Sequence, residues 1–406
     1  MRILVVNWFP HVAGGAETYL RGLFPALIKQ GHEVALAYAY PLISGRESLA
    51  VELPLRLFRL SNQDLEASLS ALDSWAPDVA YAHSQGDPNL ERALIDRYPS
   101  VLFGHNYFGT CSTGEKSFAF PRARPCTRRY GPMCLVLHYP RRCGGLNPLT
   151  AWHEFQKQGA RNRNLRRYRA IVVASRHMAA EFRNNGVPAD RVHQVSLPFG
   201  EGLRNTAPPE PRESHGRLLM VGRLTRGKGG EHLLRAIPIA ARRLGVALRL
   251  TIAGGGPEQA RLEGLARRLG VAVDFAGWVD SARRDALMRE ADLLVIPSVW
   301  PEPFGLVGLE AGCVGLPSVS YAVGGITEWL IPGEGGELAP GDPPTPAGLA
   351  AAIVRALKDG GHHQRLRRGA WEIVNRFDMA SHLARLEPIL AAAASEQRTV
   401  GRPAVG

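Results

Sequence analysis

The chain has 406 residues, of which 45% are hydrophobic and 21% charged, and its formal net charge is +12. This composition is ordinary for a globular protein and argues against disorder, and the length suits two domains that each bury a core. No apolar run approaches the ~20 residues that cross a bilayer, and the start, Met1 to Val6, lacks a signal-peptide pattern. We therefore expect a cytoplasmic protein.

The first half of the chain alternates strand-like apolar runs with helical segments. The pair Gly14-Gly15 follows the first run, and leucines at helical spacing then predict a helix over 17–30. Strands are expected at 3–7, 79–82, 101–104 and 171–174. This order is typical of a parallel sheet covered by helices on both faces. We assign residues 1–203 to one Rossmann-like domain with a cysteine-containing insertion at 106–150.

The second half repeats the α/β pattern after a polar, proline-rich stretch. That stretch, residues 204–216, is interpreted as a linker. Strands are expected at 217–221, 249–253, 273–275, 293–296 and 318–321. We assign 217–375 to a second Rossmann-like domain, 376–394 to a terminal helix and 395–406 to a mobile tail.

Cations and glycines follow the first strand of the second half. Arg223 offers a planar fork to phosphate oxygens and Lys228 a point charge, while Gly227, Gly229 and Gly230 allow close backbone approach. Strand, glycine turn and helix start coincide there, as phosphate sites require. The pattern predicts a diphosphate site rather than generic surface cations.

Two glutamates bracket the segment that follows the strand at 293–296. Pro303 and Gly305 let the chain turn, and the free N–H groups of the following helix start favour a phosphate. Glu310 is expected roughly two helical turns beyond Glu302, about 12 Å along the axis, which is too far for an acid/base pair on one bond. Two carboxylates beside a phosphate site predict a ligand with hydroxyl groups, such as a sugar nucleotide.

This segment resembles the E-x7-E signature of the retaining glycosyltransferases of family four, and the arginine and lysine upstream match that family's phosphate-binding pair. The resemblance implies a GT-B fold: two Rossmann-like domains with parallel sheets facing across a cleft, and a terminal helix that returns to the first domain. It implies that Glu302 contacts donor-sugar hydroxyls and Glu310 the ribose. The backbone near the sugar and phosphates would be that of Phe304, Gly305, Leu306 and Val307. Gly277 to Asp280 resembles the stretch that contacts the nucleobase.

Other candidates sit where strands of the first half should end, at the edge facing the cleft. Gly14 and Gly15 allow close approach of a diphosphate, although a structural turn explains them as well. Family members often have a histidine where His105 stands, which would bond the donor sugar without having to transfer a proton. His83 follows another strand end, and packing explains it as readily as catalysis.

The insertion holds four of the five cysteines, Cys111, Cys126, Cys134 and Cys143. Clustered thiols in a cytosolic protein favour metal over disulfides, yet the spacing lacks the paired C-x2-C of recognisable zinc sites. A structural metal, redox-sensitive pairs and packing cysteines all stay open. The insertion also follows His105 directly and is a candidate for part of the acceptor pocket.

The basic charge is concentrated after the insertion, in a helix expected over 152–169 with arginines beside Trp152 and Phe155. An anionic membrane surface or acceptor fits this pattern, and so does a solvated face. A peripheral place at the inner face of the membrane therefore stays open. No nucleic-acid motif with recognisable spacing is present, so we expect no nucleic-acid partner.

These features predict a retaining hexosyltransferase that moves a sugar from a nucleotide sugar, a UDP- or GDP-sugar first, to a saccharide, lipid-linked or small-metabolite acceptor, as in polysaccharide biosynthesis. It would need no catalytic metal and no other cofactor. The alternatives are an idle scaffold that binds a membrane or partner, and a sugar-nucleotide epimerase on the same fold. An oxidoreductase is disfavoured because no G-x-G-x-x-G follows the first strand.

Overall fold

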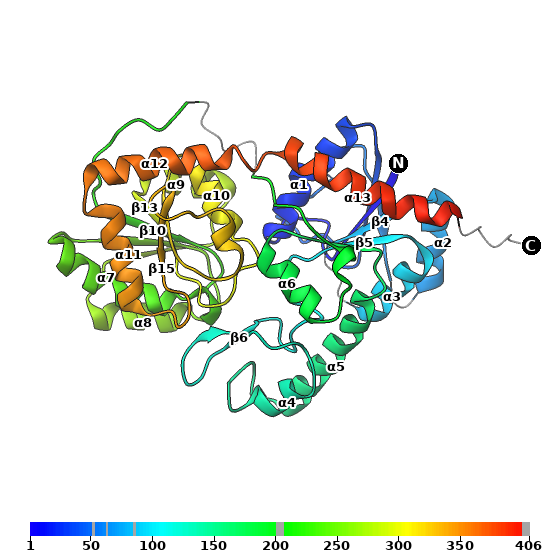
Figure 1. Ribbon diagram of the computed structural model, residues 1–406, viewed down its shortest axis with the longest axis horizontal. Coiled ribbons are helices and arrows are strands. Elements are labelled where there is room, and N and C mark those ends of the chain that lie inside the picture. Colours follow the sequence, from blue (N-terminus) through cyan, green and yellow to red (C-terminus); the bar gives the residue numbers. More distant parts are fainter. Residues whose placement is uncertain (51–52, 62–63, 84–86, 200–206, 400–406) are drawn as a thin grey trace, which may run out of the picture.

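The computed structural model describes residues 1–50, 53–61, 64–83, 87–199 and 207–399. Two parallel sheets dominate it, one from each half of the chain, with helices packed on them (Figure 1). The predicted α/β class with two parallel sheets is therefore confirmed. No helix in these ranges is long and apolar enough to cross a membrane.

The sheet of the first half has the strand order β3-β2-β1-β4-β5-β8-β9, and all its pairs are parallel. Its strands are β1 (Arg2–Asn7), β2 (Glu33–Tyr38), β3 (Arg56–Arg59), β4 (Val79–Ala82), β5 (Ser100–Phe103), β8 (Ala170–Val173) and β9 (Val192–Gln194). Alternate side chains of β1 enter different cores: Ile3 lies in one apolar cluster and Leu4 in the other. Both faces are therefore covered, which explains the unbroken apolar run.

The helices of the first half follow the strands as expected for right-handed crossovers. They are α1 (Gly15–Lys29), α2 (Leu65–Trp75), α3 (Pro88–Arg97), α5 (Pro148–Leu165), α6 (Arg176–Asn184) and the short 3-10 helix η1 (Ala189–Arg191). The insertion before α5 contains only a two-residue antiparallel pair, β6 (Ser117–Phe118) with β7 (Arg124–Pro125), and helix α4 (Met133–His138).

The sheet of the second half has the order β12-β11-β10-β13-β14-β15, again all parallel. Its strands are β10 (Arg217–Val221), β11 (Arg249–Ala253), β12 (Val273–Gly277), β13 (Leu293–Ile296), β14 (Ser318–Tyr321) and β15 (Gly336–Ala339). Its helices are η3 (Arg226–Lys228), α7 (Gly230–Leu244), α8 (Gln259–Leu269), α9 (Ser281–Glu290), α10 (Leu306–Gly312), η4 (Gly324–Glu328), α11 (Pro346–Leu357) and α12 (Gly360–Val374). Both sheets reverse their strand order at the centre, between β1 and β4 and between β10 and β13, and ligands bind at such points.

The last helix, α13 (Met379–Thr399), leaves the second half and lies along the first, as Figure 1 shows in red. Leu383, Leu386 and Leu390 are buried there. The helix begins later than the expected residue 376, and residues 395–399 are helical although we expected them in the mobile tail. Residues 400–406 of that tail, and 204–206 of the expected linker, lie outside the described residues.

The basic helix expected over 152–169 is α5, which ends at Leu165, and part of its charge is used internally. Arg161 is buried over the rings of Trp8 and Phe108, and Arg167 is paired with Asp96. The guanidinium of Arg169 donates to the carbonyl of Ala393 at 2.7 Å. Arg161 and Arg167 thus serve contacts within the first domain, and Arg169 ties that domain to α13, while Arg163 and Arg166 are exposed. Contact of this basic helix with a membrane stays a prediction.

His382 of α13 is buried, and its imidazole Nε2 lies 2.7 Å from the hydroxyl of Tyr19 in α1. Burial lowers the pKa of His382 to about 4, against the opposing effect of the Ser196 carbonyl. An unfolded chain has an ordinary histidine pKa, so between these two values it binds the additional proton. Lowering the pH through this window therefore destabilises the fold.

We predict that His382→Gln makes the free energy of unfolding less sensitive to pH. Between neutral pH and about pH 5.5, the uncharged buried histidine lowers the free energy of unfolding by about 1.4 kcal/mol. The variant lacks this loss. Denaturant unfolding at both pH values measures it. The control is His153→Gln, whose side chain is 76% exposed. Equal pH sensitivity in His382→Gln and the unsubstituted protein would contradict the prediction.

Candidate active site

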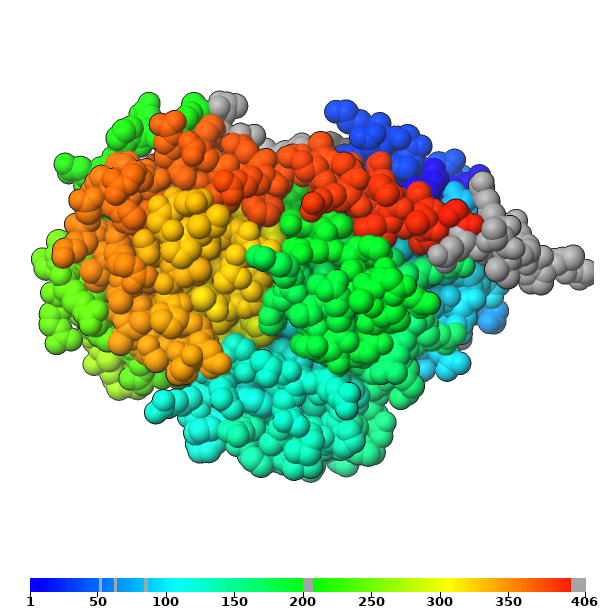
Figure 2. Space-filling model, in the orientation of Figure 1, coloured from blue at the N-terminus to red at the C-terminus, as the bar shows by residue number. Residues whose placement is uncertain are grey.

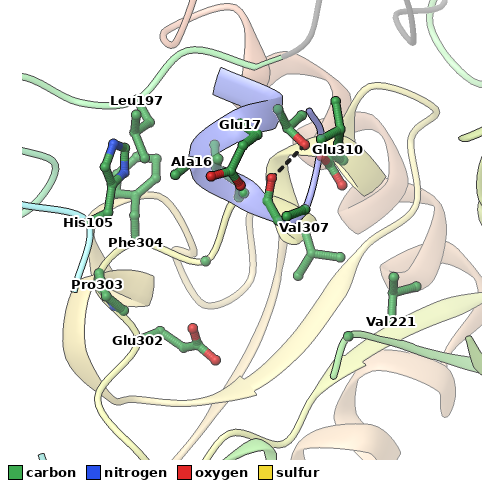
Figure 3. Close-up of a pocket in the computed structure, with 18 of the residues that line it drawn as sticks. Ala16, Glu17, His105, Leu197, Val221, Glu302, Pro303, Phe304, Val307 and Glu310 are labelled. Atoms are coloured by element: carbon green, nitrogen blue, oxygen red, sulfur yellow. Dashed lines mark hydrogen bonds between the residues drawn. The ribbon is translucent and has the colours of Figure 1, made fainter. Parts of the chain in front are cut away.

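A cleft of about 840 Å³ lies between the two halves, where both sheets reverse their strand order. Figure 3 shows side chains from both halves around it, among them Glu17 and His105 from the first and Glu302 and Glu310 from the second. The predicted site residues that line the cleft are Gly14, Gly15, His105, Lys228, Glu302, Phe304, Gly305, Leu306, Val307 and Glu310. The structure thus brings together residues that are nearly 300 positions apart in the sequence.

The turn after β10 is held by backbone-to-backbone packing. Gly229 has φ = 71°, and a Cβ atom there would lie 1.8 Å from the carbonyl oxygen of Pro297, which follows β13. Only glycine fits both the left-handed conformation and that distance. The carbonyl of Gly227 accepts from the amide of Val299 at 2.8 Å. Lys228, between these glycines, is therefore placed directly beside the loop that carries Glu302.

The Glu302 carboxylate is 5% exposed and is the meeting point of three donors. Its Oε1 accepts from the ammonium of Lys228 at 2.7 Å and from the indole Nε1 of Trp300 at 2.8 Å, and the hydroxyl of Ser298 also donates to it. The Lys228 ammonium lies 5.3 Å from the centre of the Trp300 ring. A buried carboxylate with this many donors is fixed in place.

Glu310 is on α10 and reaches the cleft beside Arg284, with 3.5 Å between a guanidinium nitrogen and a carboxylate oxygen. Burial raises the pKa of the Glu310 carboxyl, and the charge of Arg284 acts in the opposite direction. Because α10 begins only at Leu306, the expected two helical turns between the glutamates are wrong. The chain from Glu302 to Gly305 is a non-helical turn with φ = 84° at Gly305.

The backbone of the segment after Glu302 is only partly available to a ligand. Phe304 lines the cleft, but its carbonyl already accepts from the indole of Trp329 at 2.7 Å. A Cβ atom on Gly308 would lie 1.9 Å from that same indole ring. Trp329 therefore fixes the shape of this turn from behind, and the sequence pattern contains no signal of it.

Arg223 is the predicted phosphate residue that the structure does not place in the cleft. Its side chain is exposed, and it is not among the residues that line the cavity. Its charge acts on Glu115 of the insertion, whose pKa burial raises while Lys228 and Arg223 lower it. Gly222, directly before it, has φ = 144° and lines the cleft. Arg223 therefore lies near the rim, and a role at the diphosphate stays a prediction.

On the opposite wall, the first turn of α1 carries Gly14 and Gly15. A Cβ atom on either would meet only single side-chain atoms, at 3.7 Å and 4.0 Å. Internal packing does not explain these glycines, and the space above them belongs to the cleft. Glu17 is buried beside them, where its Oε1 accepts from the amide of Asn7 at 2.9 Å. Sequence reasoning missed Glu17, which shows no spacing pattern with the other site residues.

His105 lines the cleft in front of His83, with 2.9 Å between its Nε2 and the Nδ1 of His83. Burial lowers the pKa of His105 to about 3, helped by the charge that His382 would carry. The pKa of His83 is also lowered by burial. Both rings are therefore neutral at physiological pH. His83 contacts the side of His105 that faces away from the cleft. Its role is therefore to position the His105 ring, not to act on a ligand itself.

Two further cleft residues are Trp278, from the Gly277–Asp280 stretch that resembles a nucleobase-contacting segment, and Arg46, which contacts it. Trp278 is 68% exposed, and the guanidinium of Arg46 from the first half lies 4.7 Å from its ring centre. Both residues line the cleft. The sequence pattern indicated Trp278 through the Gly277–Asp280 stretch but not Arg46, because a cation–π contact between distant segments has no local signature.

The four cysteines of the insertion are free and half-buried. Burial, together with the charges that the other three cysteines would carry, raises the pKa of the Cys143 thiol to about 12. Within the described ranges no group of three or more His, Cys, Asp or Glu side chains is arranged to hold a metal ion. A structural metal at these cysteines stays a prediction.

Solved structures of similar shape establish the class of fold. Anabaena HepE, in a crystal structure with UDP and glucose, aligns over 97% of this chain and 100% of its own with a TM-score of 0.69 and 19% identity. Sucrose-phosphate synthase from Thermosynechococcus elongatus aligns over 98% and 100%, with a TM-score of 0.70 and 21% identity. The two-domain arrangement with a cleft between parallel sheets is the GT-B fold of glycosyltransferases.

Sequence comparisons define the family. Residues 14–198 match the glycosyl transferase 4-like domain, and residues 205–372 match glycosyl transferases group 1. Glycogen synthase of Mycobacterium tuberculosis is 29% identical, with 93% of this chain and 91% of the relative covered. The chain belongs to the group 1 glycosyltransferases, of family-four type, and is a glycosyltransferase.

We predict that Gly229→Ala weakens nucleotide binding by at least about tenfold, because the new methyl group collides with the Pro297 carbonyl and displaces Lys228. Isothermal titration with UDP and GDP measures the affinity, and denaturant unfolding the stability.

The matched control is Gly245→Ala. Gly245 has the same φ of 71°, but a Cβ atom there would meet no atom within 4 Å. The Gly245→Ala variant should lose only roughly 1–2 kcal/mol of unfolding free energy, because alanine is strained in the left-handed conformation. Its nucleotide affinity should be unchanged. Equal affinity losses in the two variants would show that the contact with Pro297 does not position the site.

Proposed function

We propose that this glycosyltransferase moves a sugar from a nucleotide-sugar donor to a saccharide, lipid-linked or small-metabolite acceptor, with retention of anomeric configuration and without a catalytic metal ion. The observation that carries the proposal is the contact between Lys228 and the buried carboxylate of Glu302, inside a cleft that both domains line. The donor would lie on the second domain and the acceptor would enter from the first.

Lys228 would stabilise the leaving group. When the bond between the anomeric carbon and the diphosphate oxygen breaks, negative charge develops on that oxygen, and a preorganised cation lowers the barrier. Its side chain is 30% exposed, so it can reach a ligand while Glu302 holds it in place. This charge compensation supports a reaction that proceeds without an ion at the diphosphate.

Glu302 suits orientation of the sugar better than nucleophilic attack. Its Oε1 is occupied by three donors, which lower its nucleophilicity, and Oε2 remains to accept from a sugar hydroxyl. In the proposed reaction the acceptor hydroxyl attacks the anomeric carbon from the side that the diphosphate leaves. The new glycosidic bond forms on that face, and the acceptor proton passes to the departing phosphate oxygen.

The neutral state of His105 fits a hydrogen-bonding role. With its pKa at about 3, the ring carries no charge at physiological pH and cannot act as a general acid there. Because Nε2 is engaged by His83, Nδ1 is the atom left for the donor sugar. Glu310, beside Arg284, would bind the ribose hydroxyls.

For the donor we propose a UDP- or GDP-sugar. HepE, which shares the fold, was crystallised with UDP-glucose, and relatives include a phosphatidyl-myo-inositol mannosyltransferase of M. tuberculosis. A cytoplasmic location is supported by the five free cysteines, which are typical of a reducing compartment. Membership of the family favours a transferase over the epimerase, and the intact Lys228–Glu302 contact favours it over an idle scaffold.

We predict slow release of nucleotide when the purified protein is incubated with its own donor from a panel of UDP-, GDP-, ADP- and dTDP-sugars. Lys228→Ala should reduce release by about 100-fold or more, the typical effect of removing one charge-stabilising donor. Coupled detection of the free nucleoside diphosphate measures it. Lys358→Ala, an exposed lysine away from the cleft, is the control. Unchanged release in Lys228→Ala would remove the leaving-group assignment.

We further predict that Glu310→Gln raises the Kd for the donor by about tenfold, the typical cost of a charged hydrogen bond, with a smaller effect on the rate at saturating donor. Comparing the ribose and 2′-deoxyribose forms of the nucleotide tests the assigned contact. The unsubstituted protein should discriminate between the two forms, and Glu310→Gln should not. Discrimination that persists in the variant would place the ribose elsewhere.

A further inference from the structure

The insertion forms a lobe that projects from below the two domains, seen in cyan and teal in Figures 1 and 2. Large exposed apolar side chains are concentrated on it. Those in this part of the chain are Phe120, Met133, Val136, Tyr139, Leu146, Leu149 and Trp152, with exposures from 44% to 80%. Single exposed apolar residues are normal, but a group of this kind indicates an interaction surface.

Helical spacing groups most of these side chains. In α4, Met133 and Val136 are three residues apart and so lie on the same side of the helix, with Tyr139 one step further. In the first turn of α5, Leu149 and Trp152 have the same spacing. The hydroxyl of Tyr139 donates to the carbonyl of Leu146 at 3.4 Å, which joins the two groups. We call this set, from Met133 to Trp152, the α4 surface.

The α4 surface belongs to a stretch of the sequence that is rich in exposed arginine. Between Lys116 and His153 the sequence contains no aspartate or glutamate. The exposed arginines of this stretch are Arg122, Arg124, Arg128, Arg129 and Arg142. The guanidinium of Arg142 lies 5.2 Å from the ring centre of Phe120, so cationic and apolar groups adjoin directly. Exposed apolar side chains in an arginine-rich stretch, whose nearest acidic residues in the sequence are Glu115 and Glu154 at its two ends, match the chemistry of an anionic bilayer surface.

Other occupants fit less well. A second copy of the chain would bring two sets of arginines together without compensating acids. A nucleic acid would leave Val136, Leu146 and Leu149 without apolar partners, because the phosphate backbone dominates such interfaces. The bilayer alone offers both the anionic headgroups and the apolar interior beneath them.

We propose that the α4 surface docks this protein on an anionic phospholipid bilayer. The insertion is also connected to the cleft. Glu115, at its start, lies 3.3 Å from the place that a Cβ atom on Gly227 would take, and the hydroxyl of Tyr107 donates to the carbonyl of Pro301 at 2.6 Å. Docking therefore holds the cleft at a fixed height above the membrane. A use of this position for a lipid-linked acceptor rests on the proposed function. The docking itself does not depend on that function.

The test is co-sedimentation of the full chain with vesicles of phosphatidylcholine, with and without phosphatidylglycerol. We expect binding to the anionic vesicles that weakens with salt, as surface electrostatics require. Val136→Asp should reduce the partition coefficient by about tenfold or more. The matched control is Val246→Asp, a similarly exposed valine outside the insertion (54% against 61%), which should bind as the unsubstituted protein does.

Two additional readouts separate the outcomes. Brominated lipid should quench tryptophan fluorescence, and Trp152→Phe should remove most of that quenching. Donor-dependent nucleotide release without vesicles should be the same in Val136→Asp, so a failed release assay concerns the proposed function and a failed vesicle assay concerns the docking. Absent binding to anionic vesicles, or equal loss in both valine variants, overturns the proposal. Dimers in solution that Val136→Asp dissociates also overturn it, since the face would then join two copies.

Discussion

The site depends on the approach of two loops, one after β10 and one after β13. Gly229 and the carbonyl of Pro297 are close enough that no side chain fits between them, and this contact sets Lys228 next to Glu302. Both loops leave strands that are hydrogen-bonded neighbours, so the sheet itself fixes the distance. Burying either the cation or the carboxylate alone would be costly. Because the two charges are paired, each offsets part of the desolvation cost of the other.

The two domains meet around this pair through backbone carbonyls of the same loop. Ser175, at the start of α6, donates to the carbonyl of Pro303 at 2.7 Å, and Tyr107 to that of Pro301. The loop that would bind the donor sugar is therefore also the loop that the first domain touches. A change in the angle between the domains acts directly on Glu302, without a chain of intermediates.

The central strands of both sheets could be predicted from the sequence because they are buried on both faces and appear as continuous apolar runs. The edge strand β12 was expected as well, but the edge strands of the first sheet were not: β3, Arg56–Arg59, is mostly exposed and carries two arginines, and β9 has three residues. In the site, Lys228, Glu302, Glu310 and His105 were recoverable because each follows a strand within a recognisable motif. Arg46 and Trp329 were not, since their contacts come from segments that only the folded chain brings together, and Glu17, although close to Gly15, has no spacing pattern with the other site residues.

The return of α13 has a consequence for synthesis on the ribosome. Leu383, Leu386 and Leu390 complete an apolar layer whose other members, such as Leu20 and Leu23, belong to α1. These parts of one layer are far apart in the sequence, so the N-terminal domain emerges first and yet lacks its cover until α13 has been translated. A nascent chain stopped before Met379 exposes that layer. Completion of the first domain is thus coupled to translation of the last helix, and a truncated product is marked by exposed apolar surface.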